Sequence, residues 1–179
     1  IDTAPSSGTF HEVVQETAVG HAPLGIAWDS LNEDILVCNE RSNDVSVISA
    51  FTLSVRKIVS LPSLSRPFEV VITPRQTNFG SLRNVYYGYV LSRDGAVSIF
   101  ESGPDGVNGW GYDDLIGKAR YKFRRPKAIA IDVSDLNSGV WIAHEGMIDL
   151  QTGQSAPPGT GALTRIFAQT NTLGQIPLG

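Results

Sequence analysis

The sequence of 179 residues predicts an all-β protein made of consecutive four-stranded units. Three observations support this prediction. Short apolar stretches alternate with polar turn residues, as in chains of short strands. No window carries the sustained 3.6-residue period of a helix. A proline-centred motif recurs with spacings of 44, 59 and 51 residues, at Pro23, Pro67, Pro126 and Pro177.

The first unit, residues 20–65, shows its four strands most clearly. Polar runs separate the apolar stretches, and the third stretch alternates as a half-buried strand does. Cys38, the only cysteine, lies in the second stretch and predicts a small buried side chain rather than a disulfide or a multi-cysteine zinc site. The predicted strands are residues 24–28, 35–38, 45–48 and 55–59.

The second unit, residues 66–124, repeats this order, with strands predicted at 68–72, 85–91, 96–100 and 118–123 and an insertion at 103–114. The third unit, residues 125–173, has strands predicted at 128–131, 140–143, 147–150 and 163–167. Within residues 1–19, the stretch 10–19 predicts the outer strand of a preceding unit. Residues 174–179 repeat the proline motif and predict the start of a next unit.

Four-stranded repeats of about 40–45 residues are typical of β-propeller blades, which stack radially and bury their apolar faces on one another. A β-sandwich also has many short strands. It does not, however, repeat a proline-anchored four-stranded unit three times. We therefore expect three blades of a β-propeller that belong to a larger ring.

The first unit resembles the repeat of YVTN-type propellers, which occur in surface-layer and related secreted proteins of bacteria and archaea. The residues that carry the resemblance are Pro23–Asp29, Ile35–Asn39 and Asn43–Ile48, and the second unit keeps Val97–Ile99. The repeats are also similar to NHL-type repeats. The resemblance implies a ring of about seven blades or more. It also implies a secreted, periplasmic or cell-surface protein that acts as a binding or surface module.

Ligands of propellers bind where loops from successive blades meet at the mouth of the central channel. Loops between second and third strands, and those before each inner strand, supply ten candidates: Asn39, Glu40, Arg41, Arg66, Arg93, Asp94, Arg124, Arg125, His144 and Glu145. Their alternating charge suits an anionic or sugar-like ligand on a protein or glycan partner. Solvated turns have the same composition, because turns are polar for backbone reasons.

The glycine-rich insertion at 103–114 carries oxygen ligands of the kind that Ca²⁺ takes: Asp105, Asn108, Asp113 and Asp114. Their spacing differs from that of an EF-hand loop. The alternative is a long surface hairpin pinned by Trp110 and Tyr112. Calcium is the one cofactor that the sequence suggests.

Composition and motifs argue against several functional classes. The net charge is −4, with 14 basic and 18 acidic residues, and no run of Lys or Arg predicts phosphate contacts, so nucleic acid is not an expected ligand. No stretch approaches the ~18 apolar residues of a membrane span. The three histidines are far apart in the repeat frame and no G-x-S-x-G motif occurs, so neither a zinc site nor a serine nucleophile is predicted.

We therefore expect a non-catalytic binding or scaffold module. The alternative is a propeller enzyme, such as a lyase or a quinoprotein-like oxidoreductase, whose active site is completed by other blades. Three blades alone would expose apolar faces carrying Trp28, Phe68, Ile129 and Ile131, and known rings have typically four to eight blades. Either the remaining blades of a longer chain or a second copy should complete the ring. The motif at 174–179 favours the longer chain.

Overall fold

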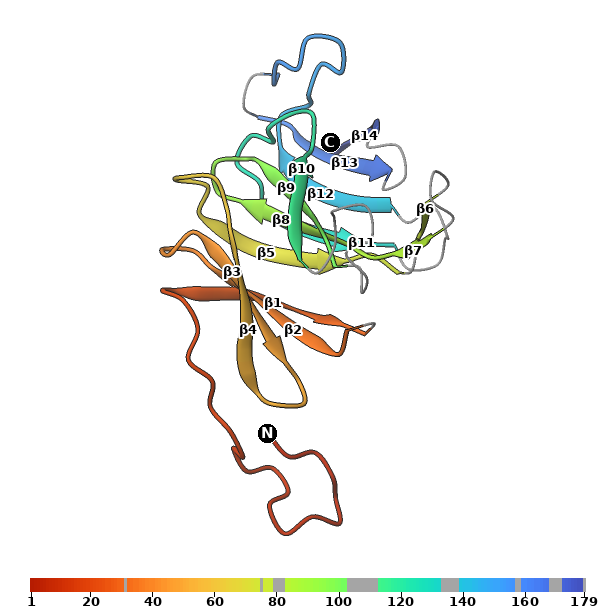
Figure 1. The fold of residues 1–179 in the computed structure, drawn as a ribbon. Helices are drawn as coiled ribbons and strands as arrows, with labels where there is room; N and C mark the ends of the chain where they lie inside the picture. The colour runs from red at the N-terminus through yellow and green to blue at the C-terminus, as the bar shows by residue number, and fades with distance from the viewer. Residues whose placement is uncertain are drawn as a thin grey trace.

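The computed structural model describes residues 1–30, 32–74, 76–78, 83–102, 113–132, 139–156, 159–167 and 172–178. Twelve of its strands form three antiparallel four-stranded sheets (Figure 1). Within the described ranges no residue is helical, and no helix is long and apolar enough to cross a membrane. The chain is thus all-β, as predicted.

Sheet 1 contains the four strands predicted for the first unit. They lie in chain order, each paired with the next: β1 (Pro23–Asp29), β2 (Asp34–Asn39), β3 (Asp44–Ser49) and β4 (Ser54–Ser60). The turn between β2 and β3 places Asn43 at a φ of 65°. Asparagine tolerates this left-handed conformation better than most residues, so Asn43 suits this turn.

Sheet 2 has the same strand order as sheet 1: β5 (Pro67–Ile72), β8 (Tyr87–Ser92), β9 (Val97–Glu101) and β10 (Asp114–Lys118). The first three strands lie where the sequence predicts them. The fourth strand, predicted at 118–123, is wrong, because the sheet strand ends at Lys118. Ala119 and Phe123 gave that stretch its apolar alternation, and they are buried in the core beyond the strand. The connection from β5 to β8 adds an unexpected hairpin, β6 (Gln76–Asn78) and β7 (Arg83–Val85).

Sheet 3 is formed by β11 (Ala128–Ile131), β12 (Gly139–Glu145), β13 (Gly161–Phe167) and β14 (Thr172–Leu178). The predicted third strand at 147–150 is wrong, because only Ile148 pairs there, in an isolated bridge to Ser155. Residues 163–167, predicted as the fourth strand, lie instead in the third strand, β13. Residues 174–178 then lie in the fourth strand of sheet 3 rather than at the start of a next blade.

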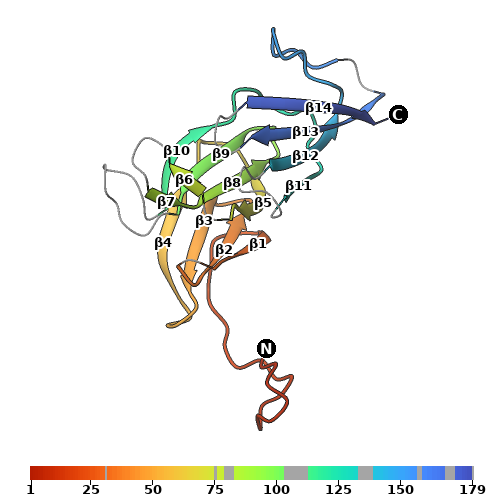
Figure 2. The ribbon, with the colours of Figure 1, turned by 90° about the vertical axis from the view of Figure 1, so that its right-hand side faces the viewer.

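The N-terminal segment forms no outer strand, so the strand predicted at 10–19 is wrong. Its one strand-like contact is a bridge between Phe10 and Asp2. Figures 1 and 2 show this segment leading away from sheet 1. Thr17 donates a hydrogen bond to the carbonyl oxygen of Leu53, at 2.7 Å, in the turn between β3 and β4. The alternating sequence of this segment has no strand edge beside it to complete a ladder.

The three sheets are stacked in chain order (Figure 2), and β5 packs against both β1 and β11. Gly25 of β1 allows β1 and β5 to lie close together. A side chain there would place its Cβ 2.7 Å from the Cα of Glu69 in β5. Glu69 also joins β5 to β11, because its Oε2 accepts a hydrogen bond from the backbone N–H of Ile129 at 2.6 Å. The innermost strands of the three sheets are therefore neighbours.

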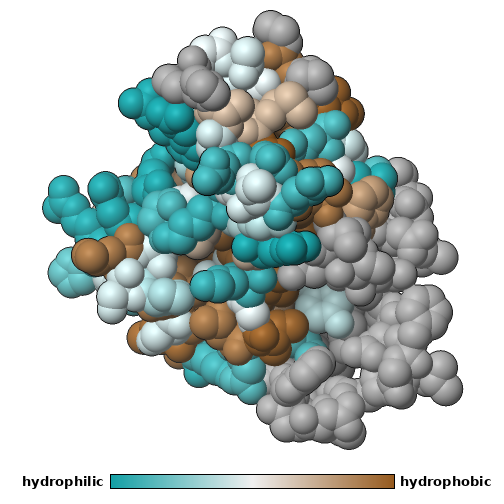
Figure 3. Space-filling view, turned by 90° about the horizontal axis from the view of Figure 1, so that it is seen from above, coloured by the Kyte–Doolittle hydropathy of each residue, from teal (hydrophilic) through white to brown (hydrophobic). Residues whose placement is uncertain are grey.

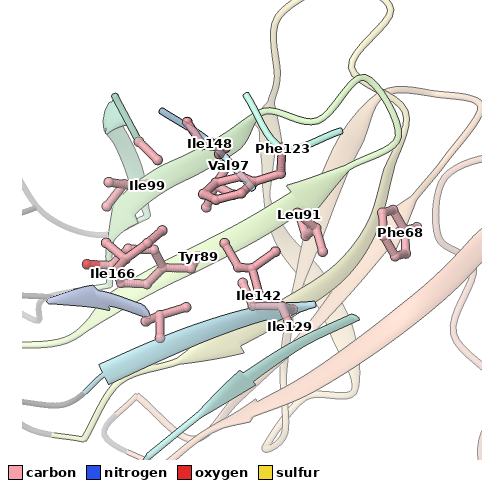
Figure 4. Close-up of a cluster of buried hydrophobic side chains, with 12 residues drawn as sticks. Phe68, Tyr89, Leu91, Val97, Ile99, Phe123, Ile129, Ile142, Ile148 and Ile166 are labelled. Atoms are coloured by element: carbon pink, nitrogen blue, oxygen red, sulfur yellow. The ribbon is translucent and has the colours of Figure 1, made fainter. Parts of the chain in front are cut away.

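Two apolar clusters fill the spaces between the sheets. Sheets 1 and 2 enclose one cluster, whose buried members are Leu36, Cys38, Val45, Val47, Val59, Leu61, Val70, Val90 and Phe100. Sheets 2 and 3 enclose the other (Figure 4), which includes Phe68, Tyr89, Leu91, Phe123, Ile129 and Ile142. Phe68 and Ile129 thus do not lie on an open face as expected, whereas Trp28 is 53% exposed. Sheet 2 is covered on both faces.

The backbone repeats an unusual conformation before Pro23, Pro67 and Pro126, the prolines of the repeated motif that precede β1, β5 and β11 and that we call marker prolines. Ala22, Arg66 and Arg125 have φ values of 55°, 57° and 41°. Non-glycine residues rarely adopt positive φ, and a following proline restricts them further. The carbonyl of Ala22 accepts the N–H of Glu40, and that of Arg66 accepts the N–H of Arg93, both at 2.9 Å. The units therefore repeat in backbone geometry as well as in strand order.

Candidate functional site

Charged loops from all three sheets gather at one edge of the stack, which we call the proline edge. It is the edge at which β1 and β5 begin at their marker prolines and at which β2 and β8 end. Seven of the chain's fourteen basic residues belong to its loops. They are Arg41, Arg66, Arg93, Lys122, Arg124, Arg125 and Lys127, and all but the half-buried Arg124 are exposed.

Glu40 joins the loops of sheets 1 and 2 at this edge. Its Oε1 lies 2.5 Å from Nη2 of Arg66 and 3.8 Å from Nε of Arg93. The guanidinium of Arg93 also stacks 3.9 Å above the ring centroid of Phe68. The backbone N–H of Arg66 donates to Oδ1 of Asn43 at 2.9 Å, so side chains of both sheets hold this loop in place.

Glu145 binds two cations of the loop that leads into β11 of its own sheet. It pairs with Nη1 of Arg125 at 3.2 Å and with Nζ of Lys127 at 3.4 Å. Between the two glutamates, Lys122 pairs with Asp94 at 2.6 Å. Each glutamate faces two cations, so the edge keeps an excess of positive charge although the whole chain is negative. Such a local excess attracts anionic groups.

Asn39 and His144, two of the ten residues expected to meet a ligand, are buried within their sheets. Asn39 donates from Nδ2 to Oγ of Ser46 at 2.9 Å, and Nε2 of His144 lies 2.7 Å from Oγ1 of Thr164. Both pairs join the end of a second strand to the third strand. Burial lowers the pKa of His144, which favours the neutral ring at this place. Both pairs are therefore side-chain hydrogen bonds between neighbouring strands inside the sheets.

The sequence carries a signal for this edge that is interleaved with apolar residues and is therefore not a continuous basic run. Residues 118–127 carry six basic and no acidic side chains, interleaved with apolar ones: Lys118, Arg120, Lys122, Arg124, Arg125 and Lys127. The apolar residues Ala119 and Phe123 turn into the core. Three of the basic residues, Lys122, Arg125 and Lys127, are thereby exposed beside Asp94 and Glu145.

The predicted calcium ligands fall partly outside the described residues, to which Asp105 and Asn108 do not belong. Asp113 and Asp114 are described, and each pairs with a cation of β4. Asp113 binds Nη2 of Arg56 at 2.7 Å, and Asp114 binds Nζ of Lys57 at 2.7 Å. The described part of the chain holds no group of three or more His, Cys, Asp or Glu side chains placed to bind a metal.

The edge opposite the proline edge is acidic and buried. Arg56 binds Asp34 as well as Asp113, and the side chains of these two aspartates are 3% and 1% exposed. Nearby, Ser102 donates a hydrogen bond to buried Asp29. Burial raises the pKa of Asp113 to about 6, although the charge of Arg56 opposes the shift. This network joins sheet 1 to sheet 2.

The raised pKa of Asp113 predicts a specific pH dependence of stability. The folded state holds this proton more tightly than the unfolded chain does, so the residue's contribution is full below pH about 4 and is lost as the pH rises through about 6. Asp113→Asn cannot titrate. We expect the free energy of unfolding of wild type, relative to the variant, to fall by on the order of 2 kcal/mol over that interval in urea titrations. A constant difference would contradict the assignment.

The other reactive side chain of interest is also enclosed. Cys38 is fully buried between sheets 1 and 2, as the sequence predicts, and burial raises its pKa to about 12. A thiol with so high a pKa is a poor nucleophile at neutral pH.

Comparison with known proteins gives no relative for this chain: no family model matches the sequence, and no curated protein matches it.

Proposed function

We propose that this chain is a non-catalytic binding module built of β-propeller blades, whose proline edge binds an acidic segment of a partner protein. Three features support the propeller. The three sheets have the same strand order, their inner strands are neighbours, and the backbone has the same conformation before Pro23, Pro67 and Pro126. The resemblance to YVTN-type blades adds the proposal of a secreted, periplasmic or cell-surface location.

The observation that carries the binding proposal is the line of cations across three sheets. Arginine presents a planar fork that pairs with carboxylates through two hydrogen bonds, and five of the seven basic residues at this edge are arginines. Glu40 and Glu145 hold their partners in place before any ligand arrives, which lowers the entropic cost of binding. Side chains of Arg66, Arg125 and Lys127 are nevertheless at least 62% exposed.

The non-catalytic part of the proposal is supported by the environments of the candidate reactive groups. His144 is bonded to Thr164 inside sheet 3, at a place equivalent to the Asn39–Ser46 pair of sheet 1. An asparagine–serine pair has no acid–base function, so the shared position indicates a structural role. Cys38 lies between two sheets.

Binding can be tested with a fluorescein-labelled peptide of ten glutamates, measured by fluorescence anisotropy at low salt. We expect the double charge reversal Arg125→Glu with Lys127→Glu to weaken binding at least tenfold, because it turns two exposed attractive charges into repulsive ones. Added salt should weaken the wild-type complex, since exposed charges are screened.

The matched control for the single reversal Arg125→Glu is Lys57→Glu, which changes net charge equally but alters β4 rather than a loop of the proline edge. It should reduce peptide binding much less. Equal losses in these two single variants would show attraction by net charge alone and contradict a site at the proline edge. Binding of a sulfated glycan but not of the peptide would also contradict the choice of an acidic protein segment.

A further inference from the structure

Each sheet has two faces that can be distinguished by strand register. The leading face is turned toward the preceding sheet in the chain, and the trailing face toward the following one. In sheet 2, Val70, Val90 and Ser98 are opposite one another across the strands and share the leading face. Ile129, Ile142 and Thr164 are the equivalent row of sheet 3, and Ile26, Val37 and Ser46 that of sheet 1.

Equivalent side chains on the leading faces differ sharply in exposure. Val70 and Ile129 on the inner strands of sheets 2 and 3 are 5% and 9% exposed, because the preceding sheet covers them. Ile26 at the same position of sheet 1 is 69% exposed. Trp28 and Ile58 share its face and are also more than half exposed. Residues on the inner and outer strands of this face of sheet 1 are thus uncovered, whereas Val37 and Ser46 on its two central strands are buried.

The opposite end of the stack presents the complementary surface. The trailing face of sheet 3 includes Ala128, Ala130, Trp141, Leu163, Arg165, Ile176 and Leu178. Ala128 and Ala130 are exposed, as are Ile176 and Leu178 on β14. Figure 3 shows the molecule from this end, with hydrophobic side chains among hydrophilic ones. The equivalent side chains of sheet 2, such as Tyr89 and Leu91, are fully buried.

We infer that the leading face of sheet 1 docks onto the trailing face of sheet 3 of a second copy of this chain. The contact would continue the interface that already joins sheet 1 to sheet 2 and sheet 2 to sheet 3. Two copies contribute six sheets, a number within the four to eight blades of known propellers. The interface is heterologous, since it joins two different surfaces of the same molecule.

The inner strands favour this pairing. Where β1 packs against β5, the trailing positions of β1 are Gly25 and Ala27, and these small residues let the strands approach closely. Ala128 and Ala130 hold the same positions of β11, two and four residues after the marker proline. β1 of a second copy could therefore lie as close to β11 of the first copy as β5 lies to β1 within one chain. Residues 174–178, expected from the sequence to begin a next blade, instead form the outer strand of sheet 3.

Association can be measured by sedimentation equilibrium on the full chain over a range of concentrations. The wild type should approach twice 19.3 kDa. Ile26→Glu and Ala130→Glu place a charge on the leading and trailing faces respectively, and each should weaken association about a hundredfold by burying an unpaired carboxylate. Phe51→Glu is the matched control, because Phe51 is 80% exposed in the turn between β3 and β4 and lies on neither face.

A mixture of the two variants tests the head-to-tail geometry. The Ile26→Glu chain keeps an intact trailing face, and the Ala130→Glu chain keeps an intact leading face. Mixing them should restore a one-to-one complex, although neither variant associates alone. All three substituted side chains are exposed, so folding should be retained and can be checked by circular dichroism. A wild type that stays at 19.3 kDa, or variants that remain apart when mixed, would overturn the inference.

Discussion

Arg56→Met should destabilise the fold by about 3–5 kcal/mol. The substitution leaves the carboxylates of Asp34 and Asp113 buried between sheets 1 and 2 without the guanidinium that binds both. Breaking a buried ion pair from one side costs this much because the remaining charge loses its compensation without regaining water. Urea denaturation at pH 7 measures the loss as a lower midpoint at unchanged slope.

Lys57→Met is the matched control for this prediction. Lys57 is the neighbour of Arg56 on β4, but its partner Asp114 is 51% exposed, so the pair is worth less than about 1 kcal/mol. Asp113→Asn added to Arg56→Met should restore part of the stability, because it removes one of the two uncompensated charges. Similar losses in the Arg56 and Lys57 variants would contradict the buried network.

Phe100→Ala should cost about 3–5 kcal/mol as well, through loss of packing rather than of charge. Phe100 is fully buried in the cluster between sheets 1 and 2. Its ring lies against Gly88 of the neighbouring strand, where a Cβ would fall 2.0 Å from the ring. Removing the ring leaves a cavity that adds to the lost transfer free energy.

Phe51→Ala provides the comparison for Phe100→Ala, since it removes the same side chain from an 80% exposed position. We expect a change within about 0.5 kcal/mol. Thermal unfolding followed by circular dichroism would show both effects. A tolerant Phe100→Ala variant would contradict the burial of Phe100 between the first two sheets.

In the second and third units the sequence predicted the inner strands better than the outer ones, whereas in the first unit it predicted all four strands. The first three strands of sheets 1 and 2 lie where alternation and polar turns place them. The second and third strands of both sheets are buried at nearly every residue, which gives short apolar runs between polar turns. The outer strands β10 and β14 are partly exposed, and their sequences carry little of this signal. Their positions depend on tertiary pairing, and they were misplaced.

The repeated proline motif was informative where it precedes an inner strand and misleading at Pro177. Before Pro23, Pro67 and Pro126 the chain adopts a positive φ, a feature that the motif's letters do not reveal. At residues 174–178 similar letters form an outer strand. For the site, charge alone indicated the loops of the proline edge. It did not separate exposed Arg66 from buried His144, because their exposure depends on the packing of whole sheets.

The stacking of sheets 1 and 2 can be tested most directly by zero-length carbodiimide crosslinking and peptide mass spectrometry. Lys57 of β4 and Asp114 of β10 are 57 residues apart in sequence, yet Nζ and Oδ1 are separated by 2.7 Å. The structure predicts an amide between these residues, together with one between Lys122 and Asp94, which are 2.6 Å apart at the proline edge. If the Lys122 crosslink forms while Lys57 joins only other acids, β4 does not lie beside β10, and the stacked arrangement of the sheets is wrong.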